Sequence, residues 1–401
     1  MVELINHGVY LLNGTEIRDN YQGMTPDEAR ENTITYGILR SHDVDGGKGN
    51  KMRIRFDAMM SHDITYVGII QTARASGLEE FPLPYAMTNC HNSLCAVGGT
   101  INEDDHVFGL SAAKKYGGIY VPANQAVIHQ YAREMMVKCG NMILGSDSHT
   151  RYGSLGNMGV GEGGGELVKQ LLKNTWDINA PEVVLVWLEG APKKGVGPHD
   201  VAISLVKATF ESGVVKNKVL EFAGPGVKNL PIDFRNGIDI MTTETTCLSS
   251  IWVTDEEVKH HYEIHERPQD YRELKPGDVA YYDMMIRIDL STQESMIALP
   301  FHPSNAVTIH ELQADPVGIL TRIEEDAKKR FGDKVDVHLV DKVVDGKVQA
   351  DQGIIAGCSG GTYDNLAEAA AILKGKNIGN DYFTASAYPQ STPVSMAAAH
   401  E

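Results

Sequence analysis

The chain has 401 residues, 42% of them hydrophobic and 22% charged, which is typical of a soluble globular protein with two or three domains. Its formal net charge is −17, from 36 basic and 53 acidic side chains, which argues against a nucleic-acid-binding surface. No apolar run reaches the roughly 18 residues of a membrane helix, no secretion signal is recognisable, and five scattered cysteines do not suggest a disulfide framework. We therefore expect a cytoplasmic protein with neither a membrane nor a nucleic-acid partner.

In the first half of the chain, helical and strand-like patterns alternate. Thr25 and Pro26 provide a cap and a first-turn proline for the first helix. Hydrophobic periodicity predicts helices over 26–39, 64–75, 105–116, 125–138 and 166–172. Short apolar runs predict strands at 51–60, 119–122, 142–144 and 182–188, with an extended segment at 81–87. This alternation indicates parallel strands joined by crossover helices, which is an α/β fold with mostly parallel sheets.

The composition changes at 190–198, where Gly and Pro are frequent, and we predict a domain boundary there. Beyond it, helices are predicted over 199–212, from 232, and over 255–266, 315–331, 364–373 and 391–401. Strands are predicted at 218–222, 281–290, 335–340 and 353–356, with 296–301 pairing to 281–290. The expected domains are 1–192, 193–312 and 313–401, the last of them only begun within this chain.

Candidate chemistry centres on residues 141–150, where a short apolar strand leads into Asp147, Ser148 and His149. Seven glycines between 153 and 165 then lead into a helix, and such a turn presents backbone N–H groups that suit an anion. His91 and Cys358 also follow predicted strands, and the remaining candidates, His129 and Glu244, lie near the ends of predicted helices. Several acid–base groups and a thiol on such loops suggest proton transfer near a metal. The plainer alternative is a glycine-rich connection with an aspartate that caps a turn.

Five segments together resemble the motifs of the aconitase superfamily. The DSHT signature and its glycine-rich continuation match at 145–161, and the other four matches lie at 127–130, 222–227, 241–250 and 356–366. They occur in the family's order and span most of the chain. The resemblance implies three-layer α/β/α domains, of which this chain is the N-terminal part. It also implies a hydro-lyase or isomerase that acts on a small hydroxy-polycarboxylic acid and depends on a 4Fe-4S cluster.

The resemblance further implies roles for individual residues. Cys358 would be one cluster ligand, and Ser148 and His62 would contact the substrate. The acid–base groups would be His91, His129, Asp147, His149 and Glu244. The two other cluster cysteines, the substrate-binding arginines and the swivelling domain would lie beyond residue 401 or in a small partner subunit. We therefore expect this chain to be an incomplete and inactive fragment that holds no stable cluster by itself.

Some positions depart from the family pattern. Cys90 stands where the family has an aspartate beside its first catalytic histidine, and His62 stands where it has a substrate-contacting glutamine. Ile240 replaces an asparagine, and Ser359 begins a Ser-Gly-Gly sequence in place of Thr-Asn-Ser. These departures weaken the case for citrate as the substrate.

Three alternatives remain open. The chain could be the large subunit of a two-subunit isopropylmalate-type isomerase, or a non-catalytic iron-sensing protein that binds RNA, although the net charge opposes RNA binding. A third alternative is a zinc hydrolase that uses His91, Asp147 and His149.

Overall fold

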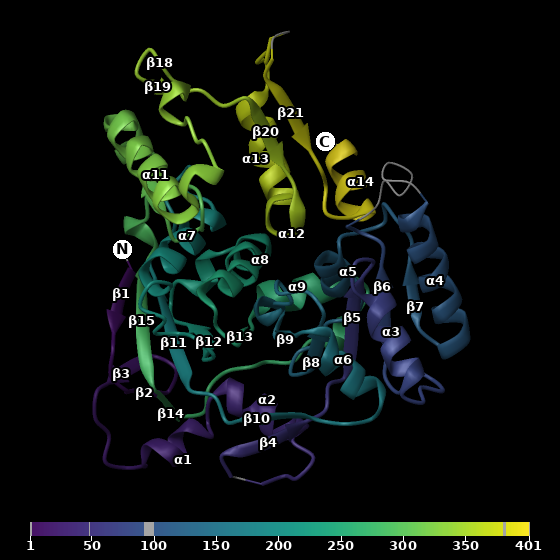
Figure 1. The fold of residues 1–401 in the computed structure, drawn as a ribbon. Coiled ribbons are helices and arrows are strands. Elements are labelled where there is room, and N and C mark those ends of the chain that lie inside the picture. Colours follow the sequence, from purple (N-terminus) through teal and green to yellow (C-terminus); the bar gives the residue numbers. More distant parts are fainter. Residues whose placement is uncertain (1, 48, 92–99, 380–381, 401) are drawn as a thin grey trace.

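The computed structural model describes residues 2–47, 49–91, 100–379 and 382–400, which form a mixed α/β structure with mostly parallel sheets, as predicted (Figure 1). Two five-stranded sheets form the body of the molecule, and the C-terminal elements lie above them in the view of Figure 1. Within the described ranges, no helix is both long and apolar enough to cross a membrane.

The first sheet has the strand order β7-β6-β5-β8-β9, and all its strands are parallel. Its strands are β5 (Ala58–His62), β6 (Tyr85–Thr88), β7 (Ile119–Val121), β8 (Met142–Gly145) and β9 (Met158–Gly161). The accompanying helices are α3 (Tyr66–Ala75), α4 (Ile101–Tyr116), α5 (Ile128–Met135) and α6 (Gly164–Leu171). Because β5 and β8 are neighbours although β6 and β7 separate them in sequence, the chain reverses its winding direction between them.

The second sheet has the order β1-β15-β11-β12-β13, in which only β1 (Val2–Ile5) is antiparallel. Its parallel strands are β11 (Val183–Glu189), β12 (Val219–Ala223), β13 (Ser249–Trp252) and β15 (Met284–Asp289). Alternate residues of β11 face opposite sides, as expected for a strand. Val184 and Val186 pack with α7 (Pro198–Thr209) and α8 (Ile232–Met241), whereas Leu185 belongs to the core that includes α2 (Ile34–His42). Helices therefore cover both faces, which gives three α/β/α layers.

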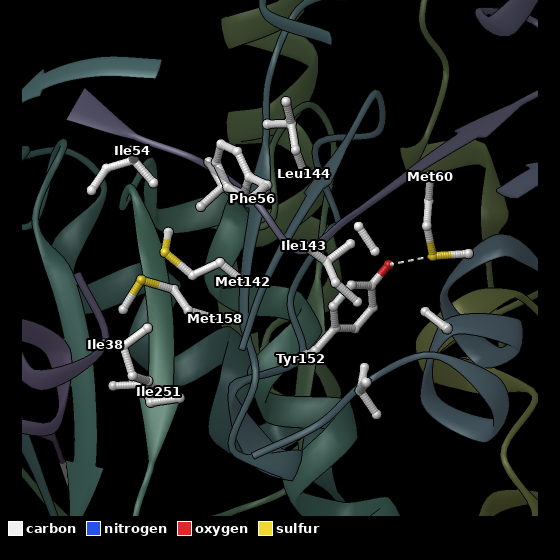
Figure 2. Packing of buried hydrophobic residues seen from close by; sticks show 14 of the residues in the cluster. Ile38, Ile54, Phe56, Met60, Met142, Ile143, Leu144, Tyr152, Met158 and Ile251 are labelled. Carbon is white, nitrogen blue, oxygen red and sulfur yellow. Dashed lines mark hydrogen bonds between the residues drawn. The ribbon is translucent and has the colours of Figure 1, made fainter. Parts of the chain in front are cut away.

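Smaller elements complete the body. One antiparallel sheet contains β14 (Val279–Tyr282), β2 (Val9–Leu12) and β3 (Glu16–Arg18), and another pairs β4 (Lys51–Ile54) with β10 (Trp176–Asn179). Helix α1 (Pro26–Arg30) precedes α2, and α9 (Glu256–Ile264) follows β13. The core beneath the first sheet is continuous, and Figure 2 shows Met142, Ile143 and Leu144 of β8 packed among Tyr152, Met158 and Ile251.

The C-terminal part begins with β16 (Met296–Ala298), β17 (Ala306–Thr308), α10 (Ile309–Ala314) and α11 (Pro316–Phe331). A short hairpin follows, β18 (Val343–Val344) and β19 (Lys347–Val348). The last elements are β20 (Gln352–Ile355), α12 (Gly357–Gly360), α13 (Tyr363–Leu373), β21 (Thr384–Ala387) and α14 (Thr392–His400). Strands β20 and β21 form a separate parallel pair.

Several predicted elements were wrong in detail. The strand predicted at 281–290 is two strands in different sheets, β14 and β15, and the same is true of 51–60, which contains β4 and β5. Segment 296–301 cannot pair with β15, because β1 and β11 already occupy both edges of that strand, and β16 pairs with β17 instead. Residues 335–340 form no strand.

Other differences arise from local capping and from strands that the patterns did not indicate. The helix predicted at 26–39 is divided, because the Thr33 hydroxyl accepts a hydrogen bond from the Tyr36 amide and so starts α2 anew. Strands β1 to β3, β10 and β13 were not predicted, and β9 lies within the predicted glycine-rich loop. The predicted domain boundaries stay a prediction. Any division of the chain must keep β11, which precedes residue 192, in one sheet with β12.

Candidate active site

The candidate site lies where β5, β6 and β8 end. His62 is the last residue of β5, Thr88 ends β6 three residues before His91, and Gly145 ends β8 two residues before Asp147. The carboxyl ends of these parallel strands open at the point where the sheet reverses its winding, which is where open α/β sheets bind ligands. The topology therefore brings together residues that are 85 positions apart in sequence, from His62 to Asp147.

Asp147 is the centre of this cluster, and four imidazoles surround its carboxylate. His129 Nε2 lies 3.1 Å from Oδ1, and the His149 backbone N–H donates to the same oxygen over 2.8 Å. His62 Nε2 and His91 Nε2 lie 3.5 and 3.7 Å from Oδ2. Burial opposes ionisation, but the hydrogen bonds with His129 and His149 outweigh it and hold the pKa of Asp147 far below its usual range. Asp147 is therefore a carboxylate at any physiological pH.

The imidazoles around this carboxylate differ in charge. Hydrogen bonds with Asp147 and with Glu244, whose Oε1 lies 3.1 Å from Nε2, raise the pKa of His149 to about 9. Burial and the neighbouring His91 lower the pKa of His62 to about 4, and burial also lowers that of His129. At neutral pH the site thus contains the His149 imidazolium close to the neutral imidazoles of His62 and His129, and opposed pKa shifts of this kind are typical of acid–base sites.

Glu244 and Ser148 border the cluster. The hydrogen bond with His149 lowers the pKa of Glu244, and His302 Nε2 lies 3.8 Å from its other oxygen. The Ser148 carbonyl accepts a hydrogen bond from the Thr243 hydroxyl, which ties the Asp147 loop to the end of α8. Ser148 is exposed, and its hydroxyl lies 3.5 Å from His149 Nδ1.

The glycines of the 153–165 segment allow close packing of this loop. A Cβ on Gly161 would lie 2.5 Å from the Asp147 carbonyl oxygen, and one on Gly153 would lie 2.3 Å from that of Ser250. Both approaches exclude any side chain. At least part of the glycine pattern thus lets β9 and β13 approach neighbouring backbone, a reason that differs from the anion-binding turn expected from the sequence.

Two residues that contact the site histidines escaped the sequence analysis. Asp63, whose side chain is fully buried, accepts a hydrogen bond from the His91 backbone N–H over 3.0 Å, and its other oxygen lies 3.3 Å from His106 Nε2. A carboxylate is therefore present beside His91 although Cys90 occupies the preceding position. The only available signal was that Asp63 follows His62 at a predicted strand end. Tyr152, also missed, places its hydroxyl 3.1 Å from His129 Nδ1.

Helix α5 connects the Cys358 loop with the Asp147 cluster, because it contacts both. His129 and Arg133 are four residues apart on α5 and so lie on one face. His129 meets Asp147, while Arg133 Nη1 donates to the Cys358 carbonyl over 3.2 Å. Burial raises the pKa of the Cys358 thiol to about 11, which the Arg133 charge opposes. One face of α5 therefore contacts both the Asp147 cluster and the Cys358 loop, and Cys358 lies on the first turn of α12.

The described residues contain one group of three or more His, Cys, Asp or Glu side chains spaced closely enough to share an ion, formed by His62, Asp63 and His91. Both oxygens of Asp63 already have partners, His91 and His106. This trio differs from the one considered for a zinc hydrolase, since it contains neither Asp147 nor His149.

Comparison with known proteins places this geometry in a family. The model of the aconitase family (aconitate hydratase) matches residues 36–401. The mitochondrial aconitate hydratase of Schizosaccharomyces pombe is 26% identical over 387 residues, covering 90% of this chain and 46% of that protein. The 3-isopropylmalate dehydratase large subunit of Elusimicrobium minutum is 28% identical over 291 residues, covering 72% of this chain and 61% of that subunit. A large subunit of Thermotoga maritima is 26% identical over 273 residues, covering 68% and 65%.

The chain thus spans about half to two thirds of the length of these relatives. The family model includes all the strand ends that carry the Asp147 cluster, as well as the Cys358 loop. The chain belongs to the aconitase family.

Proposed function

We propose that this chain provides the N-terminal catalytic part of a hydro-lyase or isomerase that acts on a small hydroxy-polycarboxylic acid. The observation that carries the proposal is the Asp147 carboxylate surrounded by imidazoles of different charge, with the His149–Glu244 pair beside it. Dehydration of a hydroxy acid requires a proton to leave a carbon next to a carboxylate and another to reach the departing hydroxyl. The residues around Asp147 include groups that can accept the proton from carbon and groups that can donate a proton to the hydroxyl.

The residues divide these tasks according to their charge. His149 holds its proton at neutral pH because Asp147 and Glu244 both stabilise the imidazolium, so it is the proton-bearing group of the site. Asp147 stays ionised and fixes the imidazoles of His129, His91 and His62 around it. His91, whose side chain is 36% exposed, is the imidazole most open to a ligand, and we assign it and His129 to the leaving hydroxyl.

The residues present fit a 4Fe-4S cluster in part. Cys358 can supply one thiolate, and the Arg133 cation beside it suits an anionic group, but a cluster takes about three to four thiolates. The others would come from outside the described residues, in a continuation of the chain or in a second subunit. When bound, such a cluster supplies a Lewis-acidic iron that stabilises the charge of a departing hydroxide.

The substrate class follows from the same arrangement. A polycarboxylate needs hydrogen-bond donors, and the site offers the Ser148 hydroxyl and the cationic His149. His62 is neutral and buried, so it contributes an imidazole N–H or a lone pair rather than a charge. This favours a hydroxy acid that presents a polar uncharged group toward β5.

A second candidate is the large subunit of a two-subunit isopropylmalate-type isomerase. Relatives named as 3-isopropylmalate dehydratase large subunits cover 68% to 72% of this chain at 26% to 28% identity, similar to the identities of the aconitate hydratases. Under this candidate, the swivelling domain would be a separate small protein. Purification of the native protein under mild conditions, followed by mass spectrometry, distinguishes a small partner from a single long polypeptide.

The test of the proposed function uses the native full-length protein or native complex, reconstituted anaerobically with iron and sulfide. Absorbance of the unsaturated product is followed with a panel of hydroxy di- and tricarboxylic acids. We expect dehydration of at least one acid, and a fall of roughly a hundredfold or more in Asp147→Asn, the size typical of losing an acid–base group. His260→Gln is the matched control, because that imidazole is 70% exposed on α9. Activity that survives in Asp147→Asn, or no turnover of any acid by a protein shown to hold its cluster, would contradict the proposal.

A further inference from the structure

Arg133 is a fully buried arginine without an acidic partner among the described residues. Its side chain is 0% exposed, yet within those residues no carboxylate oxygen lies within 4.0 Å of its guanidinium. Nη1 donates to the Cys358 carbonyl over 3.2 Å and reaches the Gln130 amide oxygen only at 3.5 Å. Nε and Nη2 are buried and have no hydrogen-bond partner there. These two N–H groups form the edge of the guanidinium that usually binds a carboxylate or another anion in bidentate fashion.

Two other buried arginines satisfy more of their N–H groups than Arg133 does, and Arg151 does so with the carbonyls of Thr150 and Cys247. Arg235 is also 0% exposed, but its two terminal nitrogens bind both oxygens of Asp255 at 2.8 and 2.7 Å. Burying a guanidinium without a counter-charge is costly, because the cation loses its hydration. The position of Arg133 therefore calls for a different explanation from that of Arg235.

Two carboxylates lie near Arg133 but do not pair with it. Glu134 accepts hydrogen bonds from the Gln130 side chain over 2.9 Å and from the Ser391 hydroxyl over 2.6 Å. Asp239 accepts from Ser250 and Trp252 through Oδ1, and its buried Oδ2 has no hydrogen-bond partner among the described residues, but the carboxylate lies beyond ion-pair distance of Arg133. The unpartnered edge of Arg133 is thus available to a group that the chain itself does not supply.

Arg133 also lies at a place built to hold the Cys358 loop. Gln390, itself 1% exposed, donates to the carbonyls of Gly357 and Cys358, so that two donors meet at the Cys358 carbonyl. The Cys358 side chain is only partly buried, which leaves a route for a ligand. We propose that Arg133 is the counter-ion of an anionic ligand held at the Cys358 loop, between α5 and α12.

The identity of that anion rests on the proposed function. Under it, the anion is the thiolate-ligated iron–sulfur group to which Cys358 contributes, whose sulfur atoms accept N–H hydrogen bonds and whose net charge is negative. A carboxylate of the substrate has the same chemistry toward a guanidinium. Whether the anion is the iron–sulfur group or a substrate carboxylate, the Arg133 guanidinium must make the electrostatic potential at Cys358 positive. This potential is measurable in the 401-residue chain without any iron–sulfur cluster.

The experiment compares how fast Cys358 reacts with iodoacetate, an anion, and with iodoacetamide, its neutral analogue. Peptide mapping by mass spectrometry gives each rate at Cys358, and the ratio of the two rates is independent of the thiolate fraction. Relative to free cysteine in the same buffer, we expect the ratio at Cys358 to favour iodoacetate roughly three- to tenfold, as one nearby cation would cause. Cys90, which lies near Asp63 and Asp147, is an internal reference in the same map.

Substitutions then test whether Arg133 is the source of this positive charge. Arg133→Met should abolish the preference and Arg133→Lys should keep most of it, whereas Arg151→Met, which removes another buried arginine, should leave it unchanged. If Arg133→Met does not fold, high salt should reduce the preference in the unaltered protein, because it screens the charge. A ratio at Cys358 equal to that of free cysteine, or one unchanged in folded Arg133→Met, would overturn the proposal.

A second measurement separates the two sources of the anion. Tricarballylate, a tricarboxylate without a hydroxyl, is added to the same chain, and its melting temperature is recorded. Stabilisation that is lost in Arg133→Met assigns the guanidinium to a substrate carboxylate, and a charge preference without such stabilisation assigns it to the iron–sulfur group. Failure of the full-length protein to turn over any hydroxy acid would count against the proposed function and would leave the charge at Cys358 established.

Discussion

The two-sheet body and the C-terminal segment that follows β19 achieve their structures in different ways. In the body, strands such as β11 and β12 are buried almost throughout, and large side chains fill two extensive cores. In α12, α13 and α14, by contrast, no hydrophobic residue is buried, and Ile354, Ile372 and Met396 are more than half exposed. Polar contacts link the segment to the body, among them Arg133 with the Cys358 carbonyl, His199 with Ser359 and Ser391 with Glu134.

This contrast matters for function because the two regions contribute different parts of the site. The acid–base residues belong to the body and are fixed by its cores, whereas Cys358 belongs to the sparsely packed segment. Hydrophobic burial is the main source of folding free energy, so the acid–base cluster should persist under conditions that release Cys358.

The largest expected effect tests the contrast in stability directly. Ile286 in β15 is 0% exposed and Ile372 in α13 is 70% exposed, so the same substitution to alanine samples both regions. We expect Ile286→Ala to lower the free energy of unfolding by about 3 kcal/mol, through lost burial and a cavity. Ile372→Ala should change it by less than about 0.5 kcal/mol. Urea unfolding measures both, and similar losses would show that the segment is packed as firmly as the body.

A somewhat smaller effect is expected at the junction of the two regions. Gln390→Ala removes the donors to the Gly357 and Cys358 carbonyls in a buried setting, which should cost about 1–3 kcal/mol of local stability. Amide hydrogen exchange should therefore accelerate in residues 352–361 and stay unchanged in β5 and β8. Gln349→Ala, at an exposed position, is the control. Equal protection of 352–361 in the two variants would mean that other contacts hold the Cys358 loop.

The body should show a pH dependence that arises in its acid–base cluster. The pKa of His149 is raised to about 9 from an ordinary value of 6.5. Its contribution to stability is therefore fully present below about pH 6.5 and is lost as the pH rises through 9. Because the side chain is partly exposed, we expect a loss on the order of 1–2 kcal/mol between these limits, measured by urea unfolding. His149→Gln should remove this slope and His260→Gln should retain it; a slope that persists in His149→Gln assigns it to another group.

The sequence predicted the local features of the site better than its long-range contacts. His129, Asp147 and Glu244 lie within contiguous motifs, so the sequence was sufficient to select them as candidates. Asp63 was missed because its contact with His91 depends on β5 and β6 being neighbours, and residue spacing does not contain that information. The pairing of β16 was missed for the same reason, since a single strand pattern does not reveal that both edges of β15 are occupied. The helix predicted at 26–39 is divided into α1 and α2 because a local cap at Thr33 overrides a continuous periodicity.

The smallest effect concerns the link between the body's core and its acid–base cluster. Tyr152 is fully buried in the core, and its hydroxyl lies 3.1 Å from His129 Nδ1 and 3.7 Å from Met60 Sδ (Figure 2). Tyr152→Phe keeps the ring and removes the hydroxyl, so we expect about 1 kcal/mol of destabilisation, the usual value for one hydrogen bond. We also expect the hydroxyl, by donating to Nδ1, to favour the His129 tautomer whose Nε2–H faces Asp147. Nitrogen-15 NMR of labelled histidine should therefore show a changed His129 tautomer ratio in Tyr152→Phe. An unchanged ratio would mean that Asp147 alone sets the tautomer and that the core supports the cluster only sterically.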